Sequence, residues 1–177
     1  MKQRISTLLT SGVLALTLFG AAVAGPLEDG AAAYKRGDYA TALQSFRRLA
    51  DRGSATAQYE LGVMYGQGQG VPQDYAQAVA WYRKAAEQGD VAAQHNLGVA
   101  YFSGQGVARD NVLANMWLNL AASRAKDATV RETMVEDLDL VAAFTTPAQI
   151  AEAQRMAREW KPRASSRRAG SGGTDPR

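Results

Sequence analysis

Hydrophobic and small residues recur at helical spacing through the middle of the chain. Ala57, Leu61 and Tyr65 share one face at 100° per residue, and Ala78 and Tyr82 share one face of the following segment. This spacing is helical rather than strand-like, because a half-buried strand alternates with a period of two. The pattern therefore predicts a pair of amphipathic helices.

The whole pattern returns 36 residues later without a gap. Trp81 aligns with Trp117, and the glycine-rich segment 68–71 aligns with 104–107. Self-similarity at a fixed period is the sequence signature of a repeat protein. We therefore divide a helical domain at 25–162 into a weaker N-terminal unit at 26–56, repeats at 57–92 and 93–128, and C-terminal cap helices at 129–162.

The end of each unit is marked by a residue that should stop its second helix. Gly53 and Gly89 stand where a left-handed helix stop requires glycine. Ala125 occupies the corresponding place in the last repeat. We therefore expect the last repeat helix to continue toward Lys126.

These recurring residues resemble the Sel1-like repeat family, a relative of the tetratricopeptide repeat. The first repeat holds the family pattern as Leu61-Gly62, Tyr65, Gly68-x-Gly70-Val71, Asp74, Ala78, Trp81-Tyr82 and Ala85-Ala86. The resemblance implies an all-α fold, namely a right-handed α-α superhelix (solenoid) of helical hairpins with a C-terminal capping helix pair. It also implies a bacterial exported protein that acts as an adaptor for other proteins.

Residues 1–24 have the features of a secretory signal peptide. Lys2 and Arg4 precede an apolar run that ends in small residues at Ala24. Cleavage there would leave Gly25 first and release the protein to the periplasm or outside the cell. A retained membrane anchor is the alternative, and after cleavage we expect no integral membrane segment.

Charge is unevenly distributed. The chain has 20 Lys and Arg and 17 Asp and Glu, and residues 25–160 have a net charge of 13 − 16 = −3. An acidic body is a poor electrostatic match for nucleic acid. The basic segment 163–177 has no apolar content to bury, so we expect a disordered tail that solubilises the chain or weakly tethers it to an anionic envelope surface.

The residue inventory argues against catalysis. The absence of cysteine and the single histidine exclude thiolate chemistry and multi-histidine metal sites. His95 lacks a nucleophile and an orienting acid in any recognisable motif, and the glycine run 66–70 lacks the ending that a phosphate-binding loop requires. We expect no enzyme, cofactor or metal. An envelope-associated or peptidoglycan-associated structural protein is the alternative function, and a cell-wall hydrolase is the least favoured one.

A further predicted helix combines apolar residues at helical spacing with a cluster of carboxylates. We expect the carboxylates to form a solvated face; the alternative is an acidic patch for a basic partner, the chain's own tail included. The apolar positions are Val130, Met134, Leu138 and Val141, and the carboxylates are Glu132, Glu136, Asp137 and Asp139.

Helix geometry also predicts a binding face. The sides of the first helices that point away from the hairpin interior should line the concave surface of the stack, where large apolar side chains would anchor a protein or peptide. The alternative is that a neighbouring helix, such as the C-terminal cap, covers them. The predicted ligand-binding residues are Tyr59, Val63, Gln67, His95, Asn96, Val99 and Phe102.

Overall fold

The computed structural model describes residues 25–164, which contain helices and no strand. None of these helices has the length and apolar character needed to cross a membrane. The expected signal peptide at 1–24 and most of the expected tail, 165–177, lie outside the described residues. The helices are α1 (Pro26–Lys35), α2 (Tyr39–Asp51), α3 (Ala55–Gln67), α4 (Tyr75–Glu87), α5 (Val91–Ser103), α6 (Asn111–Arg124), α7 (Ala128–Ala142) and α8 (Pro147–Glu159).

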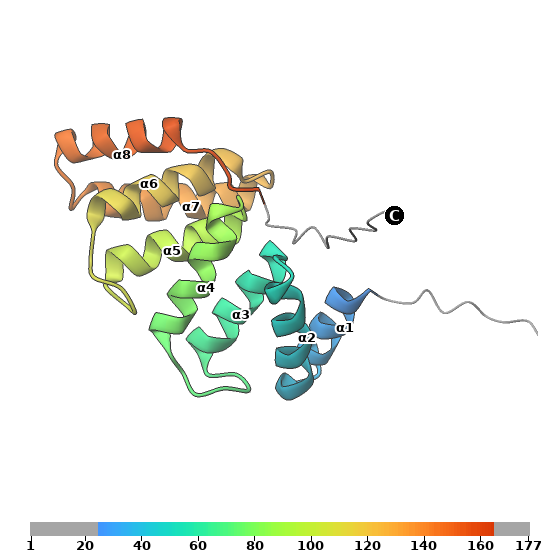
Figure 1. The fold of residues 1–177 in the computed structure, drawn as a ribbon. Helices are drawn as coiled ribbons and strands as arrows, with labels where there is room; N and C mark the ends of the chain where they lie inside the picture. The colour runs from blue at the N-terminus through green and yellow to red at the C-terminus, as the bar shows by residue number, and fades with distance from the viewer. Residues whose placement is uncertain (1–24, 165–177) are drawn as a thin grey trace, which may run out of the picture.

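The helices form a curved stack of hairpins, which confirms the predicted α solenoid. Each helix from α1 to α6 packs against the next, and Figure 1 shows α1 at one end of the stack. At the other end, α7 and α8 both pack on α6 rather than on each other. The last repeat is therefore covered by two helices that do not form a further hairpin.

Acidic residues at equivalent places start the second helix of each hairpin. Asp38, Asp74 and Asp110, each 36 residues apart, accept a hydrogen bond from a backbone N–H in the first turn of α2, α4 and α6. Ser54 and Asp90 cap α3 and α5 in the same way. Such caps satisfy donors that the helix itself leaves unpaired, so the repeat of the sequence fixes the repeat of the helix starts.

The helix ends follow the prediction in two units and depart from it in the third. Gly53 and Gly89 have φ values of 88° and 95°, so glycine does stop α2 and α4. Ala125 adopts an extended conformation, with φ −59° and ψ 121°, and α6 ends at Arg124. The expected continuation toward Lys126 is therefore wrong: an extended residue stops this helix without glycine.

Small residues bring the two helices of a hairpin close together, as the sequence predicted. A Cβ atom on Gly62 would overlap the ring of Tyr82, and one on Gly98 would lie 2.8 Å from Cγ of Leu118. Leu97, on the same face, is fully buried. Burying a leucine side chain stabilises the fold by about 1.5–3 kcal/mol, so this interior face supplies much of the hairpin's stability.

Each glycine loop also seats its repeat on the preceding hairpin. The backbone of Gly70 lies so close to Tyr39 that a Cβ atom would be 3.0 Å from the Tyr39 carbonyl oxygen. At Gly106, the equivalent atom would overlap the Tyr75 carbonyl oxygen and lie 2.7 Å from the Ala76 nitrogen. Both glycines have positive φ, so conformation and space each require glycine here.

The face of α7 differs in part from its prediction. Met134 and Val141 are buried, but Val130, which was expected on the same apolar stripe, is 46% exposed. Val130 lies in the first turn of α7. Three of the four carboxylates are exposed, whereas Asp137 is only partly exposed and contacts α5.

Candidate functional site

A hollow of about 200 Å³ opens between α3, α4 and α5. Its apolar side chains are Ala78 and Val79 from α4 and Val99 and Ala100 from α5. Val99 is 38% exposed, which is high for a residue of this kind in a packed stack. The remaining lining residues of this α3–α5 hollow are Gly66, Gln67, Tyr75, Tyr82, Asn96 and Gln105, so no ionisable acid or base of Asp, Glu, Lys, Arg or His type is among them.

Three of the seven predicted site residues line this hollow. Gln67 comes from the last turn of α3, and Asn96 and Val99 come from α5. The amide groups of Gln67 and Asn96 offer both hydrogen-bond donors and acceptors beside the apolar floor. The hollow therefore brings polar amide groups from α3 and α5 together with apolar surface from α4 and α5.

Tyr59 and Tyr82 close one side of the same face. Their rings lie 6.0 Å apart between centroids, and Tyr82 fills the space that Gly62 leaves open. Burial raises the pKa of Tyr82 to about 12, so its hydroxyl stays protonated at physiological pH. Tyr59 is thus part of a packed aromatic pair, and Val63 on the same helix is partly exposed.

Two carboxylates add negative charge next to this aromatic pair. Burial raises the pKa of Glu60, and the charge of Asp90 raises it further. Burial also raises the pKa of Asp90 itself. The pKa of Tyr59 is raised by burial first and by Glu60 second. The edge of the face near Tyr59 is therefore anionic, in contrast to the uncharged hollow.

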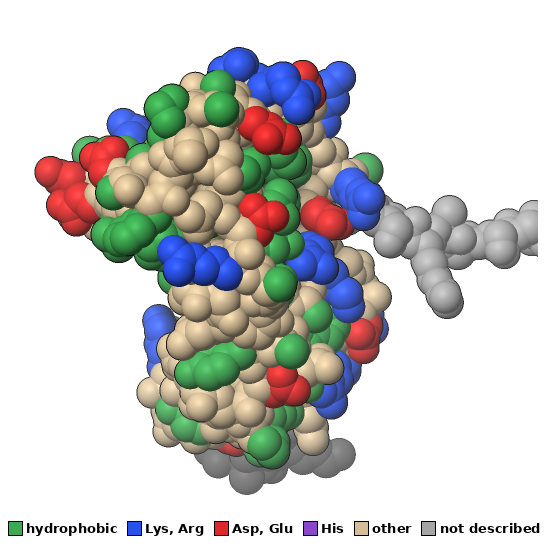
Figure 2. All heavy atoms as spheres, turned by 90° about the vertical axis from the view of Figure 1, so that its left-hand side faces the viewer, with side chains coloured by type: hydrophobic (Ala, Val, Ile, Leu, Met, Phe, Trp, Pro, Cys, Tyr) green, Lys and Arg blue, Asp and Glu red, His purple; other side chains and the backbone are tan. Residues whose placement is uncertain are grey.

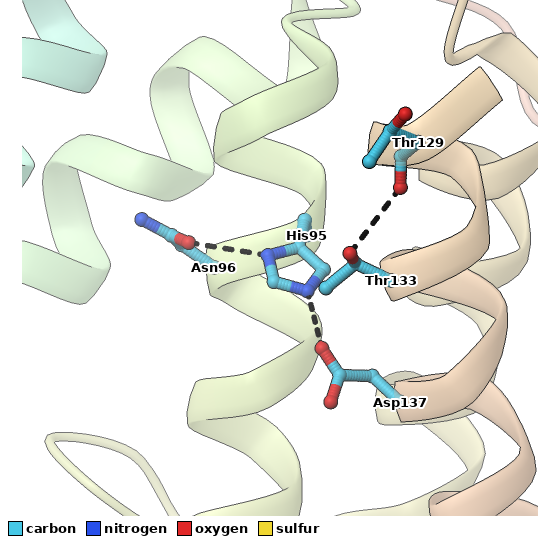
Figure 3. A network of polar contacts seen from close by, with 5 residues as sticks. All are labelled: His95, Asn96, Thr129, Thr133 and Asp137. Atoms are coloured by element: carbon cyan, nitrogen blue, oxygen red, sulfur yellow. Dashed lines mark hydrogen bonds and ion pairs between the residues drawn. The ribbon is translucent and has the colours of Figure 1, made fainter. Parts of the chain in front are cut away.

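His95 faces α7 instead of the hollow. Its Nε2 atom lies 2.7 Å from Oδ2 of Asp137, and its Nδ1 atom lies 3.4 Å from Oδ1 of Asn96 (Figure 3). On the facing side of α7, the Thr133 hydroxyl donates to the Thr129 carbonyl oxygen at 3.3 Å. His95 therefore ties α5 to α7, and Asn96 lies between this tie and the hollow.

Phe102 is likewise engaged by residues from later in the chain. Its ring centroid lies 5.7 Å from that of Phe144, and the guanidinium of Arg109 lies 5.1 Å from it. The end of α7 and the residues after it thus cover this part of the predicted stripe. His95 and Phe102 are therefore contacted by α7 and by Phe144 after it, as in the alternative in which the C-terminal cap covers these side chains.

Several residues around the site escaped the sequence reasoning. Tyr75 and Gln105 come from a helix start and a glycine loop, which face-by-face analysis of the first helices does not consider. The sequence did offer a signal for each: Tyr75 directly follows the helix-capping Asp74, and Gln105 stands between Gly104 and Gly106. Phe144, which follows α7, is 60% exposed. Figure 2 shows Asp and Glu side chains at the left edge of the molecule next to hydrophobic side chains.

Residues 25–164 also bear on catalysis and metal binding. In this part of the chain no three side chains of the His, Cys, Asp or Glu type lie where they could share one metal ion. His95 lies against Asp137, and among the described residues no Ser or Thr hydroxyl hydrogen-bonds to either side chain. What the arrangement offers is an uncharged apolar recess with amide groups at its rim.

Comparisons with known proteins agree with the repeat and the fold. The family model of the Sel1 repeat matches residues 55–90 and 91–125. A crystal structure of c5321, a protective antigen present in uropathogenic Escherichia coli strains and displaying an SLR fold, superposes with a TM-score of 0.70 and 33% identity, covering 76% of this chain and 29% of that one. A Sel1 repeat protein from Oxalobacter formigenes gives a TM-score of 0.58 and 29% identity, covering 76% of this chain and 56% of that one.

This chain therefore spans less than two thirds of the length of both proteins. The comparison with curated proteins gave no match. The likeness thus concerns the repeats and the way they stack.

Proposed function

The chain is a Sel1 repeat protein, and from this premise we propose that it is a non-enzymatic scaffold that binds an extended peptide segment of a partner protein in the α3–α5 hollow. Sel1 repeats are typical of protein-interaction scaffolds, and the concave side of a helical solenoid is the surface that such proteins offer to ligands. The observation that carries the proposal is the hollow itself.

The size of the hollow favours one side chain of a peptide over a whole small molecule. At about 200 Å³ it exceeds a cavity of about 150 Å³ that accommodates benzene, and it is smaller than the roughly 300–1,000 Å³ of typical small-molecule sites. Ala78, Val79 and Ala100 provide an apolar floor. One bulky aliphatic or aromatic residue would fill this space.

The rim of the hollow suits a peptide backbone. The side chains of Gln67, Asn96 and Gln105 can each donate and accept hydrogen bonds, as a backbone amide requires. No lysine or arginine lines the hollow, so a terminal carboxylate would find no counter-charge. The peptide should therefore present an internal apolar residue, and the charges of Glu60 and Asp90 nearby disfavour acidic neighbours.

The cellular part of the proposal is export to the bacterial envelope. It is supported by Lys2, Arg4 and the apolar run before Ala24. The first helix begins at Pro26 with Gly25 as its N-cap, so cleavage after Ala24 would leave this helix whole. N-terminal sequencing of the protein from a periplasmic extract tests it. A sequence that starts at Gly25 is expected, and one that starts at Met1 would contradict it.

A peptide selection tests the binding proposal. Residues 25–177 would be used to select from a displayed library of random peptides, and the recovered peptides would be measured by fluorescence anisotropy. We expect one fixed position with a large apolar residue. Replacing that residue by Asp should weaken binding at least about tenfold, which corresponds to about 1.4 kcal/mol.

Matched protein variants locate the site. Val99→Asp places a charge in the hollow, whereas Val135→Asp makes the same change on α7 at a similarly exposed valine, 40% against 38%. Only the first should abolish binding, and both should keep their helical circular dichroism. Equal binding by folded Val99→Asp would show that the hollow is not the site. Separately, in-cell crosslinking followed by mass spectrometry would identify the partner protein.

A further inference from the structure

The chain turns back along the stack after α8. Trp160 packs edge-on against Trp117 with ring centroids 6.1 Å apart, and the guanidinium of Arg124 lies 4.3 Å from the Trp160 ring centroid. Three residues later, the backbone N–H of Arg163 donates to the carbonyl oxygen of Glu87 at 2.8 Å. The segment after α8 thus reaches the C-terminal end of α4, as Figure 1 shows.

Arg163 binds this helix end in two ways. Besides the backbone hydrogen bond, its guanidinium lies 2.8 Å from Oε2 of Glu87. A helix C-terminus carries partial negative charge, so a cation there is favoured by the helix as well as by the carboxylate. Glu87 is the last residue of α4. The contact therefore depends on an acidic residue at the end of the second helix of a hairpin.

A groove of about 360 Å³ continues from this contact toward the preceding hairpin. Arg163 and Ala164 lie along it, and Asp51 and Gly53 at the end of α2 lie along it as well. The described residues stop at Ala164, inside this α2–α4 groove. Residues 165–177 follow Ala164 directly in the sequence.

The two ends of the groove are equivalent positions of the repeat. Asp51 is the last residue of α2 and lies 36 residues before Glu87. Among residues 25–164, Glu87 has an ion-pair partner and Asp51 has none. The basic residues of the groove are Lys84 and Arg163. Arg163 is paired with Glu87, and Lys84 stacks on Trp81 with its Nζ atom 3.8 Å from the ring centroid. The groove thus presents a second acidic helix end like the first.

We propose that Arg167 and Arg168 dock in the α2–α4 groove and pair with Asp51, repeating one hairpin earlier the contact of Arg163 with Glu87. The segment has reach beyond Arg163, because the four residues from Arg163 to Arg167 span up to about 13–14 Å when extended. The intervening residues are alanine and serine, which are small enough for a narrow groove. The C-terminal segment is then a strap across the edge of the stack, at the end of α4 opposite to the hollow.

Backbone order in the full chain tests the strap. NMR relaxation of residues 25–177 should give an order parameter near 0.85, typical of a rigid backbone, for Ser166 to Arg168. Asp51→Asn should lower it below about 0.6, and so should about 0.5 M NaCl, because both weaken an exposed ion pair. Glu132→Gln on α7 removes the same charge elsewhere and should leave the order unchanged.

A charge exchange separates a direct pair from an indirect effect. Asp51→Arg should release the segment, and adding Arg167→Asp and Arg168→Asp to that variant should order it again. Order parameters below 0.6 in the unmodified chain, or order that persists in Asp51→Asn, would overturn the proposal. So would a segment that is mobile in the free protein and becomes ordered only with vesicles of anionic phospholipid, since its binding site would then be an external surface.

Discussion

The loop between α5 and α6 allows a matched test of how the repeats are seated on one another. Gly104 and Gly106 have nearly the same backbone conformation, with φ values of 74° and 72°. A Cβ atom at Gly104 would lie 3.6 Å from its nearest neighbour, Cβ of Arg109, which is ordinary contact. At Gly106 the same atom would overlap the backbone of Tyr75 at the start of α4.

The cost of Gly→Ala should therefore differ between the two positions. Left-handed backbone costs an L-residue about 1–2 kcal/mol, and this applies to both variants. Overpacking against a fixed backbone adds about 1–3 kcal/mol, and this applies only to Gly106→Ala. We expect Gly104→Ala to lose about 1–2 kcal/mol and Gly106→Ala about 2–5 kcal/mol. The Tm of the second should then be lower by about 2–12 °C, given about 2–4 °C per kcal/mol for a chain of this size.

Thermal unfolding followed by circular dichroism at 222 nm measures this difference. Urea unfolding of the same variants gives the free energies and shows whether the transition stays two-state. Binding of a selected peptide adds a second readout, because Tyr75 and Gln105 line the hollow next to this contact. Equal losses of stability at the two glycines would refute the inference that close backbone packing of Gly106 seats the repeat.

Three further predictions concern single side chains. Burial raises the pKa of Glu60 and Asp90, so the folded state holds protons on these carboxyl groups more tightly than the unfolded state does. The stability of the fold should therefore fall as the pH rises from the unfolded-state pKa to the raised folded-state pKa. Glu60→Gln should thus raise the Tm by up to a few degrees near pH 7 and lose this advantage below about pH 4 in thermal scans; a constant gain would contradict the cause. Gln58→Met should cost about 1 kcal/mol more than Gln94→Met in urea unfolding, since both side chains donate to a carbonyl but only Gln58 also accepts a side-chain hydrogen bond. Asp137→Ala should speed amide exchange in α7 and leave α1 to α4 unchanged; uniform acceleration would mean global destabilisation instead.

The fold was predictable because its main determinants are local and repeated. Asp74 and Asp110 cap helices within three residues of their own position, and Gly89 acts at a single backbone position. The tight packing at Gly62 occurs within one hairpin. Each of these caps and glycines has an equivalent 36 residues away, so the helix boundaries predicted from them do not rest on a chance occurrence of one residue. The end of α6 was mispredicted because Ala125 departs from the repeat.

The site was predictable only where it follows helix faces. Angular position on the first helices selected Gln67, Asn96 and Val99, which line the α3–α5 hollow, and their role in binding stays a prediction. The contact of His95 with Asp137 joins residues 42 positions apart and has no counterpart in the other repeats, because Tyr59 stands at the equivalent place. Long-range contacts made once leave no periodic trace in a single sequence.

The seating of each glycine loop on the hairpin before it has a consequence for how such a protein can evolve. Gly70 approaches Tyr39 as Gly106 approaches Tyr75, so neighbouring repeats present interchangeable docking surfaces. Recombination that duplicates or deletes 36 residues in register would therefore add or remove one hairpin and leave α1 and the α7–α8 end as they are. Each duplication would also copy the junction that forms the hollow. The valency of the scaffold could in this way change in single steps without any new interface having to arise.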